Sequence, residues 1–330
     1  MKERSWLFAL VAAGAMVLGL SDTSSAGFAN DDGYSYTQPG AELVMPYDTE
    51  EGRVTFLVAS NISGRLVTTH WIFWNESCNE EVDFSICLTP NDTVVVDPRN
   101  MQGIDANNEA VGPAISLSGV KGLATVIAYE SDGDCTPYGA EGEDEYPIAD
   151  NALVGSFTFA DTNDGYSFGN DALALGTDGG VVQVPEPASG NDYEFVIQTF
   201  NPDSVDASLV VLSHLREWSD DTVRPSALPI RLSTNFVDTT EIPTSLPDTT
   251  VSCTEFYSIS DNLIPAATTV STSGILRMQP QAGLTAGTDY MYGIVGQAIS
   301  AYGSSSSVKV EQIPGSASPA FIDGTDSGLF

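Results

Sequence analysis

The chain has 330 residues, with 45 Asp and Glu against 11 Lys and Arg, which gives a formal net charge of −34. A surface this acidic repels nucleic acid and anionic lipid, so it excludes polyanion-binding functions and favours divalent cations or basic molecules as partners. Acidity also keeps an exported protein soluble, and this simpler interpretation stays open. The length is sufficient for a full hydrophobic core, in one large unit or two smaller ones.

The first 26 residues have the pattern of a secretory signal peptide. Lys2 and Arg4 form a basic start, an apolar run covers 6–20, and residues 24–26 (SSA) are small enough for cleavage. The apolar run of ~15 residues is shorter than the ~20 that a membrane-spanning helix needs. We therefore expect cleavage after Ala26, a mature chain with no membrane span, and a secreted or extracytoplasmic location (periplasm, cell surface or extracellular).

Runs of alternating residues predict β-strands along the chain, because the side chains of a strand alternate between its two faces. In the first half the predicted strands cover 41–47, 53–60, 67–74, 82–87, 94–96, 121–130 and 153–159. The strand over 67–74 carries Trp71 and Phe73 on one face and Ile72 and Trp74 on the other. It is therefore expected at the centre of a sheet, or covered on both sides.

Three further segments of the first half carry specific predictions. Residues 41–47 are expected to form an edge strand. In the strand over 53–60, the apolar side chains of Val54, Phe56 and Val58 share one face. Residues 171–175 (DALAL) predict a short helical turn.

The second half repeats the pattern, with predicted strands over 193–200, 207–215, 268–279 and 289–300. Asn201-Pro202-Asp203 separates the first two of these and predicts a hairpin turn. Residues 219–229 and 238–252 are rich in Pro or Thr and are expected to be connections. Many short strands separated by turn residues indicate an all-β fold, an antiparallel β-sandwich of the immunoglobulin-like or jelly-roll-like kind with long acidic loops.

The predicted organisation is one β-sandwich unit over 27–315, followed by a flexible tail over 316–330. The alternative is a division into two sandwiches near 185–191, which is the least strand-like break in the chain. We favour the single unit because Cys253 needs a disulfide partner and the other three cysteines precede that break.

The four cysteines, Cys78, Cys87, Cys135 and Cys253, predict two disulfides in an exported chain, with three pairings open. Cys78 and Cys87 flank one predicted strand, whose five extended residues span ~17 Å, whereas a disulfide needs Cα atoms within ~7 Å. Their pairing is therefore disfavoured. Since Cys135 follows a long strand and can share an end of the sheet with Cys78, we favour Cys78–Cys135 and Cys87–Cys253.

The residues that most often carry out catalysis have no pattern here that indicates an active site. His70 and His214 are the only histidines, and neither lies at a metal-binding spacing from another His or a Cys, so both are interpreted as hydrogen-bonded structural residues. No Gly-x-Ser-x-Gly motif is present, and disulfides explain the cysteines better than a catalytic thiol does. We therefore expect a non-enzymatic protein with no catalytic residues and no organic cofactor.

Calcium is the one ligand that a sequence pattern supports. Residues 161–165 (DTNDG) resemble the start of an Asp-rich calcium loop, with Asp161, Asn163 and Asp164 as the candidate metal ligands. The glycine comes one residue early for an EF-hand, and no Glu stands at the twelfth position. A solvated turn is therefore the alternative interpretation of this loop.

The stretch 43–98, which contains WIFWNESC (71–78) and DFSICLTPND (83–92), and the later GYSFGNDALAL (165–175) resemble exported all-β proteins of Gram-negative bacteria that have no assigned activity. This resemblance implies an extracytoplasmic β-sandwich and supplies no functional residue.

Strand content, acidity and the missing catalytic motifs together predict a structural or interaction component of the cell surface or extracellular space. Self-association or other surface components are the expected partners, and neither nucleic acid nor a membrane is expected. The alternative is a carbohydrate-binding module or a sugar-active enzyme, whose aromatic platform would use Trp71, Trp74, Trp218 or Tyr292. Trp71 and Trp74 are predicted on opposite faces of their strand, so they are not expected to form one platform.

Overall fold

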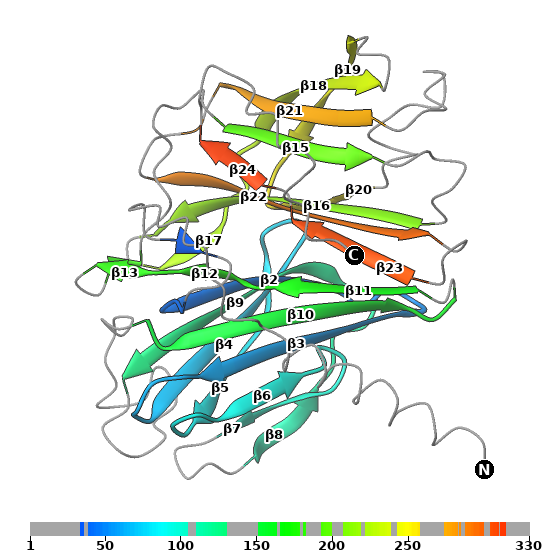
Figure 1. Ribbon diagram of the computed structural model, residues 1–330. Helices are drawn as coiled ribbons and strands as arrows, with labels where there is room; N and C mark the ends of the chain where they lie inside the picture. Colours follow the sequence, from blue (N-terminus) through cyan, green and yellow to red (C-terminus); the bar gives the residue numbers. More distant parts are fainter. Residues whose placement is uncertain are drawn as a thin grey trace. The chain divides into compact units, whose positions relative to one another are not determined.

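The computed structural model describes residues 34–35, 39–104, 110–130, 151–163, 166–178, 181–182, 193–199, 207–218, 222–238, 243–257, 274–282, 284, 288–299, 304–309 and 311–314. Every regular element in these ranges is a β-strand, and the strands form several antiparallel sheets (Figure 1). The predicted all-β class is confirmed, and the sheets are consistent with a β-sandwich. The predicted signal peptide (1–26) and the predicted tail (316–330) lie outside the described residues.

Sheet I has six strands in the order β1-β12-β2-β9-β4-β5. They are β1 (Tyr34–Ser35), β12 (Leu173–Leu175), β2 (Glu42–Asp48), β9 (Lys121–Glu130), β4 (Val67–Asn75) and β5 (Glu80–Leu88). β4 lies between β9 and β5, and it is buried on both faces from Val67 to Trp74, so the prediction for this strand is confirmed. β2 lies between β12 and β9, so the prediction of an edge strand over 41–47 is wrong.

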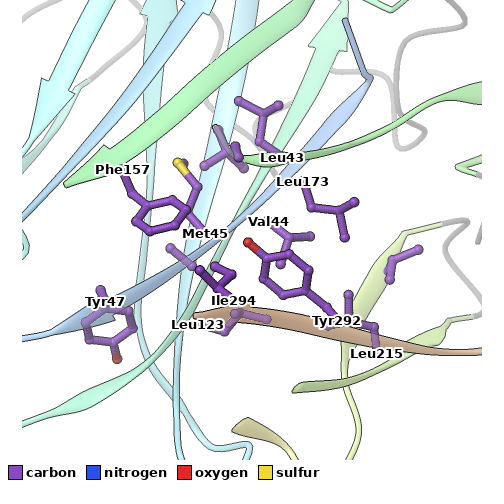
Figure 2. Close-up of a cluster of buried hydrophobic side chains, with 14 of the residues drawn as sticks. Leu43, Val44, Met45, Tyr47, Leu123, Phe157, Leu173, Leu215, Tyr292 and Ile294 are labelled. Atoms are coloured by element: carbon purple, nitrogen blue, oxygen red, sulfur yellow. The ribbon is translucent and has the colours of Figure 1, made fainter. Parts of the chain in front are cut away.

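Sheet II has four strands in the order β11-β10-β3-β6. They are β11 (Tyr166–Asp171), β10 (Leu153–Asp161), β3 (Arg53–Asn61) and β6 (Thr93–Val96). The inward side chains of sheets I and II belong to one buried apolar cluster, in which Phe157 of β10 lies beside Met45 of β2 (Figure 2). On the β4 side of this core, Trp71 and Phe73 stack on Phe84 of β5, with ring centroids 6.2 and 6.0 Å apart.

Strand β3 turns an unexpected face toward this core. Thr55, Leu57 and Ala59 are fully buried. The apolar residues that alternate with them, Val54, Phe56 and Val58, are only half-buried and lie on the opposite face. The three predicted residues do share one face, but it is the outward face of sheet II.

Two further sheets are built from the second half of the chain. Sheet III has the order β19-β18-β21-β15-β24, and its strands are β19 (Pro243–Val251), β18 (Ile230–Asp238), β21 (Gly274–Ala282), β15 (Tyr193–Thr199) and β24 (Glu311–Pro314). Sheet IV has the order β17-β16-β22-β23, with β20 also paired to β16. Its strands are β17 (Val223–Pro225), β16 (Ala207–Glu217), β22 (Asp289–Ile299), β23 (Ser304–Lys309) and β20 (Thr254–Tyr257).

Two short hairpins complete the described strands. One pairs β7 (Met101–Ile104) with β8 (Ala110–Ile115), and the other pairs β13 (Thr177–Asp178) with β14 (Val181–Val182). We call β1–β14 the first strand group and β15–β24 the second. Among the described residues, no hydrogen-bonded ladder joins the two groups. The prediction that they fold as one unit rather than two stays a prediction.

Buried side chains of both groups nevertheless belong to one contiguous apolar cluster. Val44 and Leu123 of sheet I lie close to Leu215 and Tyr292 of sheet IV (Figure 2). By strand alternation, Val44 and Leu123 are on the face of sheet I that points away from sheet II. Sheet I is therefore buried on both faces because sheet II and the second strand group each contribute side chains to it.

Three predictions of local structure are wrong, and strand pairing is the reason in each case: with distant strands in the first two, and with the preceding strand β18 in the third. Residues 173–175 form strand β12, which pairs with β1 and β2, instead of a helical turn. Residues 193–199 and 207–217 belong to sheets III and IV and do not form a hairpin with each other. The segment 238–252 contains β19, whose prolines are tolerated because β19 is at the end of sheet III.

Candidate functional site

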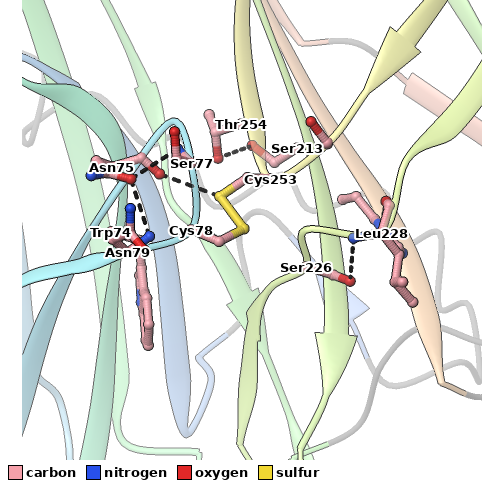
Figure 3. The surroundings of a disulfide bond; sticks show 12 residues. Trp74, Asn75, Ser77, Cys78, Asn79, Ser213, Ser226, Leu228, Cys253 and Thr254 are labelled. Atoms are coloured by element: carbon pink, nitrogen blue, oxygen red, sulfur yellow. Dashed lines mark hydrogen bonds between the residues drawn. A yellow bond between two sulfur atoms is a disulfide. The ribbon is translucent and has the colours of Figure 1, made fainter.

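Within the described part of the chain, a disulfide and several polar contacts connect the two strand groups, and they form the candidate site. Its centre is the disulfide between Cys78 and Cys253, whose Cα atoms are 5.4 Å apart (Figure 3). Cys78 lies in the turn between β4 and β5, and Cys253 lies in the turn between β19 and β20. The disulfide therefore links residues that are 175 positions apart and belong to different strand groups.

This pairing corrects the favoured prediction of Cys78–Cys135 and Cys87–Cys253. Cys87 is also disulfide-bonded, and its partner lies outside the described residues. The expectation that Cys78 and Cys87 do not pair is confirmed, and so is the expectation that Cys253 pairs across the break near 185–191. The error came from the position of Cys253, which depends on the pairing of β20 with β16 rather than on any local pattern.

Backbone hydrogen bonds hold both cysteines in place. The Asn75 side-chain Oδ1 accepts from the amides of Ser77 (2.8 Å) and Asn79 (3.1 Å), and the Cys78 amide donates to Asn75 O (3.0 Å). On the other side, the Cys253 amide donates to Ser226 O (2.7 Å). Both cysteines have positive φ angles, 60° for Cys78 and 62° for Cys253, so each turn positions its sulfur with a backbone conformation that L-residues rarely adopt.

Three glutamates surround Lys121 beside this disulfide. The Lys121 Nζ is 3.2 Å from Glu50 Oε1 and 3.6 Å from Glu76 Oε1, and it lies 5.4 Å from the centre of the Phe256 ring. Burial raises the pKa of Glu76 and also that of Glu255, while the charge of Lys121 lowers both. Lys121 therefore offsets only part of the cost of placing these carboxylates between the strand groups.

The raised pKa values predict a measurable pH dependence of stability. A carboxyl group whose pKa is raised by folding stabilises the folded state below its unfolded pKa, and this stabilisation is lost as pH rises through the folded pKa. We therefore expect Glu255→Gln to raise the melting temperature at pH 7 and to change it little near pH ~3, where glutamates are protonated in both states. Glu80→Gln, at an exposed position of β5, is the control for the general loss of one negative charge. An equal effect of both variants at pH 7 would contradict the role assigned to burial.

A second contact places a cation between two tryptophans. The Arg224 guanidinium is 5.8 Å from the Trp74 ring of sheet I and 5.1 Å from the Trp218 ring of the second strand group. The neighbouring Val223 amide donates a 2.9 Å hydrogen bond to Oε2 of Glu42, which is fully buried. The hydrogen bond to Glu42 is charge-assisted and shielded from water, so it fixes β17 against sheet I, and the cation–π contacts of Arg224 add to it.

Both histidines are buried and contact carboxylates, but the two carboxylates differ in exposure. The His214 side chain is 1% exposed, with Nδ1 2.9 Å from Leu228 O and Nε2 3.2 Å from Asp289 Oδ1. A carbonyl oxygen only accepts, so Nδ1–H of His214 donates to Leu228. Both ring nitrogens are therefore occupied by protein atoms. His70 Nε2 lies 3.1 Å from Asp83 Oδ2, and Asp83 is 53% exposed.

His214 also connects the surrounding strands through its backbone. Its amide donates to Cys253 O (2.8 Å), and its carbonyl accepts from the Ser226 amide (2.7 Å). One residue of β16 thus holds the β19–β20 turn, the segment after β17 and, through Asp289, the start of β22. This geometry agrees with the interpretation of His214 as a hydrogen-bonded structural residue.

The predicted calcium loop is only partly described. Asp161 Oδ1 accepts from the Asn163 amide (2.9 Å), and Asp161 Oδ2 lies 3.5 Å from Arg53 Nε. The second candidate ligand, Asn163, reaches Glu51 O with its side chain at 3.5 Å, whereas Asp164 lies outside the described residues. Within the described ranges, no group of three or more His, Cys, Asp or Glu is placed to hold a metal ion. Calcium binding at Asp161, Asn163 and Asp164 stays a prediction.

The aromatic candidates for a sugar platform are mostly in the core. Trp71, Trp74 and Tyr292 are buried, and Trp71 and Trp74 belong to different buried clusters on opposite faces of β4, as predicted. Trp218 differs because its side chain is 47% exposed. Only this one of the four candidates is accessible for stacking on a ligand.

Comparisons with known proteins add little to these observations. No protein-family model matches the chain. No match was found among curated proteins. The crystal structure of a "putative secreted protein" from Parabacteroides distasonis is similar over 78% of this chain and 82% of that one, with 10% sequence identity and a TM-score of 0.18. A TM-score this low supports no argument about this chain.

The disulfide is the observation in the structure that bears on location. Disulfide bonds form in oxidising compartments, so the Cys78–Cys253 bond is consistent with a location outside the cytoplasm. In the ranges that the structure describes, no helix has the length and apolar character to span a membrane.

Proposed function

We propose that this protein is an exported, non-enzymatic component of the cell surface or extracellular space that acts through its surface. The observation that carries the proposal is the buried His214–Asp289 pair, one of two contacts between a histidine and a carboxylate in the described residues. Its imidazole is 1% exposed, and both nitrogens are bound by Leu228 O and Asp289. A histidine in this state has no nitrogen left to take a proton from a substrate, so its role is to join strands.

The polar groups between the strand groups support the same conclusion. The Cys78–Cys253 disulfide, the Lys121 cluster and the Arg224 contact all connect parts of the fold to one another. An oxidised covalent link between distant strands is typical of a protein that must keep its shape outside the cell. We infer a rigid structural or interaction module whose partners bind to its outer surface.

The second candidate function is carbohydrate binding, which the exposed ring of Trp218 favours. An aromatic ring held by Arg224 from one side can stack on a sugar from the other. This site would be a single aromatic residue rather than the platform that several tryptophans form.

A glycan array and a calcium titration distinguish these functions. We expect no specific glycan binding by the exported chain. Specific binding that is lost in Trp218→Ala would contradict the proposal and establish the carbohydrate-binding alternative. Calcium-dependent assembly, measured by light scattering with and without EDTA, would support a surface component that uses its acidic loops, including the predicted loop at Asp161.

A further inference from the structure

The outward face of sheet II carries no charged side chain over three adjacent strands. The register of β3 with β10 and β6 places ten residues on this face: Val54, Phe56, Val58, Ser60, Val154, Ser156, Thr158, Ala160, Thr93 and Val95. We call these ten residues the neutral face. Apolar and hydroxyl side chains alone form it, on a chain whose net charge is −34.

Burial shows that the neutral face is directed away from the core. Along β3 and β10 the alternate residues, such as Leu57 and Phe157, are fully buried, whereas the members of the neutral face are half-buried. Val95 of β6 is 59% exposed, which is the largest exposure among the large apolar side chains described. Exposed apolar surface that is collected on one face is typical of a protein–protein contact.

The composition of β3 strengthens this interpretation. Its outward set includes three large apolar residues over 54–58, whereas its inward set over the same strand has only one, Leu57, beside Thr55 and Ala59. A strand that needed only to fill the core would place the larger apolar residues inward. Asp171 of β11, paired with Ser156 of β10, starts a charged border beside the neutral face. An apolar centre with a polar border is the usual anatomy of an interface.

Charge indicates which partner fits. A basic protein would be attracted to the acidic surface elsewhere on the chain rather than to a face without charge. Two copies of this chain repel each other through every acidic face, and a contact between two neutral faces buries no charge. In a two-fold symmetric contact, each copy uses the same surface, so that surface must be complementary to itself. A face without charge meets this condition.

We propose that two copies of this chain associate through the neutral face of sheet II. This inference rests on the proposed function and deepens it, because it assigns the surface and the partner of self-association.

The test is analytical ultracentrifugation of the exported chain in EDTA, over a range of protein concentrations and salt. We expect a dimer whose Kd decreases as NaCl increases, because salt screens the repulsion between two acidic copies. Val95→Glu and Thr158→Glu are each expected to raise the Kd at least about tenfold, since each places a carboxylate in both halves of the contact. Both positions are on the surface side of sheet II, and unchanged circular dichroism and melting temperature verify the fold.

Leu228→Glu is the matched control, because Leu228 is an exposed apolar residue of the second strand group and the charge change is identical. It is expected to leave the Kd unchanged. A chain that stays monomeric, a dimer that requires calcium, or a dimer that dissociates as salt increases would overturn the proposal. Equal dimerisation by wild type, Val95→Glu and Thr158→Glu would also overturn it. These outcomes leave the proposed function in place, whereas a specific glycan ligand would contradict that function without any bearing on the dimer.

Discussion

Removing the Cys78–Cys253 disulfide, in the variant Cys78→Ser/Cys253→Ser, is expected to lower the free energy of unfolding by about 3–5 kcal/mol. The disulfide closes a loop of 175 residues, and the entropy that a cross-link removes from the unfolded chain increases with loop length. Urea denaturation of the purified chain without reductant measures the difference. The variant is expected to fold, because the apolar cluster and the Arg224 contact still join the strand groups.

Ser77→Ala is the control for this prediction. Ser77 is an exposed neighbour of Cys78 in the same turn, and its amide rather than its side chain takes part in the hydrogen bond to Asn75. We expect wild-type stability for this variant. If the double serine variant unfolded at the same urea concentration as wild type, the disulfide would not be the constraint that we assign to it.

The second large effect is expected at Asp289, where Asp289→Ala should destabilise the fold by about 3–5 kcal/mol. The substitution leaves His214 fully buried with one nitrogen deprived of its carboxylate, and it also removes the partner of Arg216, 3.7 Å away. A buried group that loses its partner keeps the cost of desolvation without the compensating contact. Thermal and urea denaturation measure the change.

The His70–Asp83 pair serves as the comparison for the His214–Asp289 pair. Asp83→Ala removes the carboxylate that faces His70, but Asp83 is 53% exposed, so we expect a loss of less than about 1 kcal/mol. His214→Leu combined with Asp289→Leu is expected to cost less than the sum of the two single changes, because neither partner is then left alone. Equal effects of Asp289→Ala and Asp83→Ala would contradict the structural role of the buried pair.

A strand of this protein could be predicted where its own side chains alternate regularly, because locating a strand does not require knowing which strand pairs with it. Residues 67–74 predicted a strand covered on both faces because Trp71 and Trp74 fall on opposite sides, and the structure confirms it. Strand partners could not be predicted in the same way. Residues 193–199 and 207–217 both alternate, but alternation contains no information about which sheet a strand joins.

The site was less predictable than the strands for the same reason. Cys253, Lys121 and Glu76 meet only because β20 returns beside β16 and the β4–β5 turn lies at the contact between the groups. No local spacing links these residues, and the favoured disulfide pairing failed at this point. On β3 the sequence showed that Val54, Phe56 and Val58 share a face, but only the structure shows that this face is turned outward.

The Cys78–Cys253 disulfide joins the two strand groups covalently, between the β4–β5 turn and the β19–β20 turn. The most direct test is mass spectrometry of peptides from the native, non-reduced chain. We predict a cross-linked peptide that contains Cys78 and Cys253, and a second that contains Cys87 and Cys135, the remaining cysteine of the chain. A peptide that links Cys78 to Cys135 would contradict this covalent link between the two strand groups.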